Sequence, residues 1–192
     1  MNAAVKIVKT EMLSQKWATL TLVTLDYRQK DGSWQRQSRE AYDRGNGAAI
    51  LLYNKQQKSV ILTRQFRLPA YVNGHPTGML TEVCAGKLDH DSPEVCIKRE
   101  TQEETGYQIR DVRKVMEAYM SPGSVTELLY FFVAEYSAHM KVDEGGGVAH
   151  EHENIEVLEM EFTEALAKVD SGEIRDAKTI MLLQYARLQN IL

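Results

Sequence analysis

Residues 86–106 read GKLDHDSPEVCIKRETQEETG, and this stretch decides the fold and the chemistry that we predict. Residues 91–94 supply a capping side chain, a proline suited to a first helical turn, and an acid that the helix dipole favours. Thr105 and Gly106 form a typical helix end, because glycine readily adopts the left-handed backbone of a C-terminal cap. The sequence therefore predicts one helix between these two signals.

Three carboxylates lie on one face of this predicted helix. Glu100, Glu103 and Glu104 are spaced at i, i+3 and i+4, so they project from the same stripe. Like charges at this spacing repel, and Arg99 offsets only part of the repulsion. A divalent cation would offset more, and oxygen ligands suit Mg²⁺ or Mn²⁺. The spacing alone is also compatible with a solvated acidic helix face.

Length and composition indicate a soluble globular protein. The 192 residues suit one domain with an extension, and 43% of them are hydrophobic and 26% charged. The net charge is -4 and no block of Lys or Arg is present, which disfavours a nucleic-acid partner. The sequence also shows no signal peptide and no apolar run of membrane-spanning length, so we expect a cytoplasmic protein without a membrane partner. Cys84 and Cys96 are expected to be buried small hydrophobes.

Alternating apolar and polar residues predict a chain rich in strands. Residues 1–42 are expected to form a β-hairpin extension that turns at Asp31-Gly32, and residues 43–192 the main domain. Further strands are expected at 48–53, 59–66, 80–84, 112–120, 128–136 and 155–162. Together with the central helix they predict an α/β (α+β) fold in which a sandwich surrounds a mixed β-sheet.

The remaining segments are predicted as loops and two late helices. Residues 68–78 are rich in turn formers, and residues 137–154 contain three consecutive glycines, so the second loop is expected to be mobile and poorly packed. Thr163 is a good N-cap for a helix that ends near Gly172. Asp176 is expected to cap a last amphipathic helix that continues to Leu188.

The order of strand, glycine-bearing loop, capped helix and terminal glycine resembles the Nudix box, G-x5-E-x7-R-E-U-x-E-E-x-G-U, in which U is a bulky aliphatic residue. The matching residues are Gly86, Arg99, Glu100, Glu103, Glu104 and Gly106. The loop before Arg99 is one residue short, and Asp91 or Ser92 stands where the first glutamate is usual. Thr101 and Tyr107 occupy positions that are usually aliphatic. The half of the box that carries the metal ligands is intact.

The resemblance to one Nudix branch extends through nearly the whole chain. Segments such as REAYDRGNGAAILLYN, RQFR, YMSPGSVTEL and GGGV look like the bacterial GDP-mannose pyrophosphatases, whose close relatives are the ADP-ribose pyrophosphatases. The resemblance implies a Nudix-type α/β/α sandwich and a homodimer formed through residues 1–42. It also implies Mg²⁺-dependent hydrolysis of GDP-mannose to GMP and mannose 1-phosphate, with Mn²⁺ as a possible substitute.

The resemblance further implies the residues of the site. The metal ligands would be the Ala85 carbonyl, Glu100, Glu104 and an acid of the glycine-rich loop, which matches Glu153 best, with Glu151 as the alternative. The same loop acid would be the general base, and Glu103 an auxiliary catalytic acid that binds metal only intermittently. The implied substrate contacts are Trp17, Ser38, Arg39, Glu40, Arg67, Ala85, Gly86, Lys87, Glu104, Glu127, His152, Glu153 and Lys178.

Several alternatives remain open on the sequence alone. Trp17 could stack on a base or lie in the core, and His150 and His152 could be solvated loop residues. ADP-ribose is an alternative substrate, because guanine and adenine differ only at base edges that the sequence does not place. A nucleotide-sugar sensor without catalysis and a structural assembly module are alternatives of other classes. The intact glutamate set argues against both.

Overall fold

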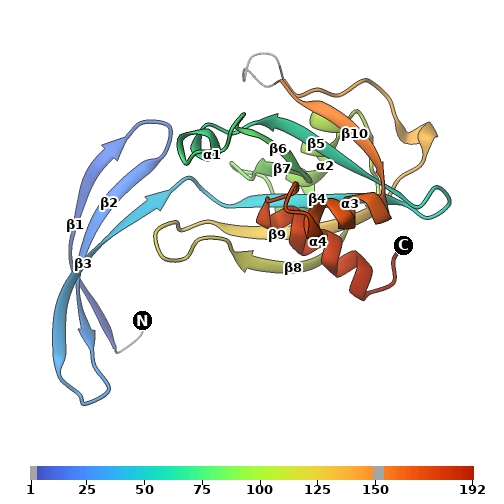
Figure 1. The fold of residues 1–192 in the computed structure, drawn as a ribbon. Helices are drawn as coiled ribbons and strands as arrows, with labels where there is room; N and C mark the ends of the chain where they lie inside the picture. The colour runs from blue at the N-terminus through green and yellow to red at the C-terminus, as the bar shows by residue number, and fades with distance from the viewer. Residues whose placement is uncertain (1–3, 149–153) are drawn as a thin grey trace. The chain divides into compact units, whose positions relative to one another are not determined.

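The computed structural model describes residues 4–148 and 154–192 (Figure 1). The chain divides into two compact units. The first comprises residues 1–46 and 119–128, and the second comprises residues 47–118 and 129–192. Each unit contains its own β-sheet, and the mixed sheet of the second unit confirms the predicted fold class.

The first unit is built on a three-stranded antiparallel sheet in the order β1 (Val5–Gln15), β2 (Thr19–Arg28) and β3 (Trp34–Asp43). The predicted hairpin is β2–β3, and Gly32 in its turn has a φ of 88°. The strand β1 was not predicted, so the description of this region as a hairpin was incomplete. Two irregularities in its pairing with β2 disturb the alternation that would have revealed it.

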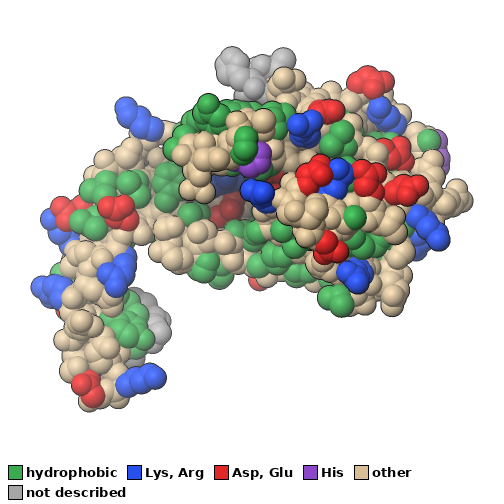
Figure 2. Space-filling model, viewed as in Figure 1, with side chains coloured by type: hydrophobic (Ala, Val, Ile, Leu, Met, Phe, Trp, Pro, Cys, Tyr) green, Lys and Arg blue, Asp and Glu red, His purple; other side chains and the backbone are tan. Residues whose placement is uncertain are grey.

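The first unit has no buried residue among those that the structure describes. Its sheet instead exposes large apolar side chains, including Ile7, Met12 and Trp34. Figure 2 shows hydrophobic side chains at the surface of this sheet, interspersed with charged ones. A sheet of three strands normally needs an apolar face packed against something else to be stable.

The second unit is built around a seven-stranded mixed sheet, with the main order β10-β5-β4-β9-β8. Its strands are β4 (Gly47–Asn54), β5 (Ser59–Phe66), β6 (Met79–Glu82), β7 (Cys84–Lys87), β8 (Arg113–Tyr119), β9 (Leu128–Glu135) and β10 (Glu156–Glu161). Strand β4 runs parallel to β9 and antiparallel to β5. The prediction of a single strand at 80–84 was wrong, because the strand is interrupted at Val83. The part before the break, β6, pairs with β5, and the part after it, β7, pairs with β4.

Helices cover the two faces of this sheet. Alternate residues of β4 point to opposite faces. Ala48, Ile50 and Leu52 join a core cluster with Cys96 and Ile97 of α2 (Pro93–Thr105). On the near face in Figure 1 lie α3 (Phe162–Asp170) and α4 (Ala177–Leu188). Both cysteines are buried and unpaired, as predicted.

The helix ends test the predictions from capping residues. Ser92 caps α2 by accepting from the Val95 backbone N–H at 3.3 Å, and Asp176 caps α4 by accepting from that of Thr179 at 3.0 Å. Thr163 was wrongly predicted as a cap, since α3 begins at Phe162, which is buried. The predicted loops contain α1 (Leu68–Val72) and a 3₁₀ turn (Ala138–Met140). In the described part of the chain, no helix has the length and apolar character that crossing a membrane requires.

The glycine-rich segment packs on the C-terminal end of α2. The last carbonyls of a helix have no partner within the helix. Here the backbone N–H of Gly146 donates to the Glu104 carbonyl at 2.9 Å, and that of Gly147 donates to the Glu103 carbonyl at 3.0 Å. Gly145, Gly146 and Gly147 all have positive φ, and a Cβ on Gly145 would lie 2.6 Å from the Glu104 carbonyl oxygen. The expectation that these glycines pack poorly was therefore wrong.

Candidate active site

Helix α2 places two of its glutamates directly against strand β7. Glu104 is only 2% exposed, and its Oε2 accepts from the Ala85 backbone N–H at 3.3 Å. A Cβ on Gly86 would overlap the carboxyl group of Glu100, so glycine at this position leaves the space that the carboxyl occupies. The structure thus brings together Ala85, Gly86, Glu100 and Glu104, four of the residues for which the resemblance implied a role in the site.

Arg99 connects Glu100 with Glu103 and with Asp91, which lies before the start of the helix. Its Nη2 lies 2.9 Å from Glu100 Oε1, and its Nη1 lies 2.8 Å from Glu103 Oε2. Its Nε lies 3.5 Å from Asp91, one of the two residues that stand where the first glutamate of the box is usual. Partial burial disfavours the charge of Arg99, but Glu100 and Glu103 outweigh it and raise its pKa. Glu103 therefore shares an arginine with Glu100, whereas Glu104 faces the strand.

The donors at this position fit a hard divalent cation. Burial, together with nearby Glu104, raises the pKa of the Cys84 thiol well above its usual value. The other donors here are carboxylate and backbone carbonyl oxygens, which suit Mg²⁺ or Mn²⁺. In residues 4–148 and 154–192, no three His, Cys, Asp or Glu side chains are grouped to hold a metal ion. Mg²⁺ commonly uses one or two protein carboxylates and completes its shell with water and substrate phosphates. The pair Glu100 and Glu104 suits that mode of binding.

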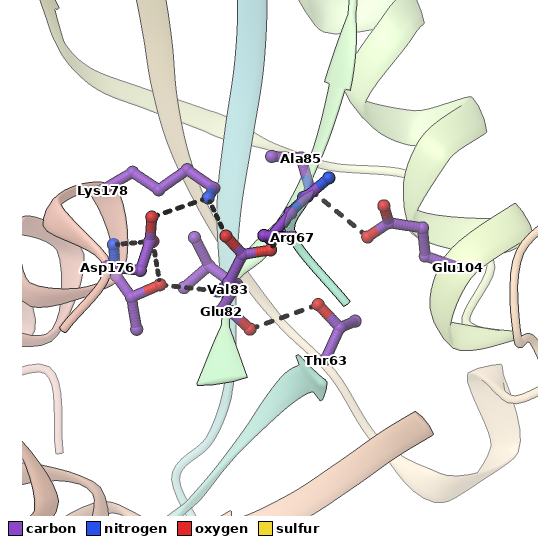
Figure 3. Close-up of polar contacts among 9 residues, drawn as sticks. Thr63, Arg67, Glu82, Val83, Ala85, Glu104, Asp176 and Lys178 are labelled. Carbon is purple, nitrogen blue, oxygen red and sulfur yellow. Dashed lines mark hydrogen bonds and ion pairs between the residues drawn. The ribbon is translucent and has the colours of Figure 1, made fainter. Parts of the chain in front are cut away.

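A second charged cluster lies at the end of β6 (Figure 3). Figure 3 shows Lys178 and Arg67 on two sides of the Glu82 carboxylate. Arg67 donates to Glu82 Oε2 from Nε at 2.9 Å, and Lys178 donates to Oε1 at 3.0 Å. Lys178 also donates to Asp176 at 2.9 Å. The sequence predicted Arg67 and Lys178 as substrate contacts, and the structure brings them together on one acid.

Both cations of this cluster are held in the charged form. Burial disfavours the charge of Lys178, but Glu82 and Asp176 outweigh it and raise its pKa. Burial also disfavours the charge of Arg67, but the nearby acids outweigh it and raise the pKa of Arg67. These acids are Glu82, Glu104 and Asp176. Glu104 of α2 is among the acids that raise the pKa of Arg67, so this cation lies within the electrostatic field of that glutamate.

No role was predicted for Glu82, and Asp176 was predicted only as a helix cap. Besides accepting from the Thr179 backbone, Asp176 accepts from Thr179 Oγ1 at 2.6 Å. That hydroxyl oxygen in turn accepts from the Val83 backbone N–H at 2.8 Å, which ties the start of α4 to the strand break. A usable signal for Glu82 was present, since a charged residue inside an apolar strand is rarely buried without a partner.

The first unit has its own cluster of predicted site residues. Trp17 is 72% exposed. The alternative that this side chain lies in the core, which the sequence left open, is therefore wrong. The Arg44 guanidinium lies 5.6 Å from the centre of the Trp17 ring. Arg44 Nε also lies 3.1 Å from Glu127 Oε1. Trp17 and Glu127 are thus linked through Arg44, for which no role in the site was predicted.

The other predicted site residues are exposed or lie outside the described residues. Ser38, Arg39 and Glu40 are exposed on β3, where the Arg39 guanidinium donates to the Ser38 carbonyl at 2.8 Å. Lys87 ends β7 and pairs with Asp89 at 3.1 Å. The predicted loop residues that lie outside the described residues are His150, Glu151, His152 and Glu153.

Comparison with known proteins covers nearly the whole chain. Residues 43–183 match the NUDIX domain, and residues 4–42 match the GDP-mannose pyrophosphatase NudK N-terminal domain. The GDP-mannose pyrophosphatases of Cronobacter sakazakii, Yersinia enterocolitica and Escherichia coli O157:H7 are 55%, 54% and 52% identical to this chain over 192 residues. Each alignment covers 100% of both chains. With its glutamates placed against the strand of the Nudix box, the chain belongs to the Nudix hydrolase family.

Proposed function

We propose that this protein hydrolyses GDP-mannose to GMP and mannose 1-phosphate with Mg²⁺ as its metal. The observation that carries the proposal is the pair Glu100 and Glu104, held against the backbone of Ala85 and Gly86. Nudix hydrolases generally use divalent metal ions. Relatives named GDP-mannose pyrophosphatase align along the full chain and support this choice of nucleotide sugar.

The metal would be held by Glu100, Glu104 and the Ala85 carbonyl, with Mn²⁺ able to replace Mg²⁺. When bound, the metal supplies charge neutralisation at the diphosphate and acidifies an attacking water. Glu153, or alternatively Glu151, is proposed as a further ligand and as the general base that accepts the proton of that water. Arg99 keeps Glu100 and Glu103 in place through its two ion pairs, and Glu103 serves as an auxiliary acid.

Substrate contacts are proposed for each of the two units separately. Arg67 and Lys178 are suited to bind the diphosphate, because an arginine fork and a lysine point charge both recognise phosphate oxygens. Gly86, Lys87 and His152 are proposed as further contacts in the main domain, residues 43–192. Contacts to the nucleoside or the sugar are proposed for Trp17, Ser38, Arg39, Glu40 and Glu127. The exposed Trp17 ring is available for stacking on a base.

The extension at residues 1–42 is proposed to form a homodimer. Among its described residues none is buried, although several large apolar side chains lie on its strands. Exposed apolar surface of this kind marks an interaction site. Strands β1 and β3 are also the two edges of this sheet, and edge strands favour a second copy of the chain as the partner.

The substrate is tested by measuring kcat/KM with Mg²⁺ for GDP-mannose, ADP-ribose and GDP-glucose, with chromatographic identification of products. We expect GDP-mannose to give the highest value and to yield GMP and mannose 1-phosphate. A higher value for ADP-ribose would replace the proposed substrate. If a wide panel gave no product while nucleotide sugars still raised the melting temperature, the sensor alternative would replace the enzyme.

The metal ligands are tested with Glu100→Gln and Glu104→Gln. Each change should lower kcat/KM by roughly a hundredfold or more, because transition-state stabilisation by the metal is worth several kcal/mol. The control is Glu94→Gln on the same helix, an exposed glutamate that pairs with Lys98 and should retain activity. Circular dichroism should show all three variants folded. Full activity in both Glu100→Gln and Glu104→Gln would exclude the proposed site.

The dimer is tested by light scattering after size-exclusion chromatography. The unaltered protein should have about twice the chain mass of 21.8 kDa. Ile7→Asp combined with Met12→Asp should shift it toward the monomer, because charge then replaces apolar contact area at the interface. Leu188→Asp places the same charge on an exposed leucine of the second unit and should leave the dimer intact. A monomeric unaltered protein would contradict the proposal.

A further inference from the structure

Glu82 is a buried carboxylate that bonds one cation through each of its oxygens. It is 3% exposed, whereas the side chains of Arg67 and Lys178 are 38% and 13% exposed. Arg67 Nη2 lies 2.7 Å from Oε2, and Lys178 Nζ lies 3.0 Å from Oε1. The acid therefore lies beneath the cations, which are more accessible to a ligand than the acid that holds them.

Fold stability alone is a weak explanation for this arrangement. Removing a carboxylate from water costs free energy, and a buried ionic group can often be replaced by apolar residues without loss of stability. Arg67 and Lys178 are also near enough that the charge of the first lowers the pKa of the second. An anion between them offsets this repulsion and keeps two cations together before any phosphate is present.

The surrounding backbone makes Glu82 a rigid support. Glu82 ends β6, and its carbonyl accepts from Thr63 Oγ1 of the neighbouring strand at 3.3 Å. The next residue, Val83, is tied to Thr179 at the start of α4. Lys178 lies on that same helix, so the acid and this cation belong to connected elements.

We infer that Glu82 is a positioning residue for diphosphate binding, which holds Arg67 and Lys178 so that both cations meet the phosphates of the substrate together. The inference rests on the proposed function, in which these two cations contact the diphosphate. Glu82 acts through them and does not itself touch the substrate. Because the cations are already ordered, they lose less conformational freedom when the substrate binds.

Steady-state kinetics on GDP-mannose test the inference through Glu82→Gln, which keeps the size of the side chain and removes its charge. We expect KM to rise about tenfold while kcat falls less than about threefold, since binding common to the ground and transition states is lost. Glu82→Asp retains the charge and should give an intermediate KM. The matched control is Glu135→Gln, an exposed acid that pairs with Lys55 at 3.5 Å and should leave both constants unchanged.

Repeating the Glu82 substitution in a protein that lacks both cations distinguishes a positioning role of Glu82 from a general effect on the fold. In the double variant Arg67→Met/Lys178→Met no cation remains to be positioned, so adding Glu82→Gln should change KM by less than about twofold. A tenfold rise in this background, or an unchanged KM in Glu82→Gln alone, would overturn the inference. If Glu82→Gln does not fold, Glu82→Asp decides in the same way: a raised KM supports the inference and an unchanged KM overturns it.

The single variants Arg67→Met and Lys178→Met distinguish this inference from the proposed function. A raised KM in both, together with an unchanged KM in Glu82→Gln, removes the role of Glu82 and leaves the diphosphate contacts in place. An unchanged KM in both removes the contacts and the inference with them. Hydrolysis of GDP-mannose by the unaltered protein tests the proposed activity whatever the results for the variants at Glu82, Arg67 and Lys178.

Discussion

The close approach of helix α2 to the backbone of β7 at Gly86 is the constraint on which the rest of the site depends. The Glu100 carboxyl occupies the space where any other residue at position 86 would place its Cβ. One turn later, Glu104 accepts from the Ala85 backbone N–H and is almost fully buried. The two carboxylates are therefore fixed by the packing of a helix on a strand, as a site built on rigid elements requires.

Both ends of α2 serve this placement. Ser92 and Gly106 set where the helix begins and ends. Glu100 and Glu104 lie on the side of the helix that faces β7. The glycine-rich segment then binds the carbonyls of Glu103 and Glu104, which the helix itself cannot satisfy. The segment that precedes residues 149–153 in the chain is thus bonded to the helix that carries the proposed metal ligands.

The charges of the site fall into two groups with different partners. On α2, Arg99 is shared by Glu100 and Glu103. At the end of β6 the relation is reversed, because one acid, Glu82, is shared by two cations. A diphosphate bound with its metal carries both negative oxygens and a positive ion, so a site with carboxylates on one side and cations on the other matches its charge distribution.

The sequence predicted the parts of this protein that local signals encode. Caps and the spacing of glutamates located α2, and Asp176 located the start of α4. Strand β1 could not be predicted in the same way, and the charge of Glu82 within an apolar strand marked this residue without showing its role, because each depends on partners that are distant in the chain. The role of Glu82 follows from its contacts with Arg67 and Lys178, which the fold brings beside it. Strand β1 is identified by its pairing with β2.

The most direct test of the account is the affinity for Mn²⁺ of the unaltered protein and of Gly86→Ala, measured by electron paramagnetic resonance titration. The added methyl group must displace the Glu100 carboxyl. We predict that Gly86→Ala remains folded and binds Mn²⁺ at least about tenfold more weakly, as expected when metal ligands are misplaced. Equal Mn²⁺ affinity in the two proteins would contradict the claim that Glu100, held against β7, forms the metal site.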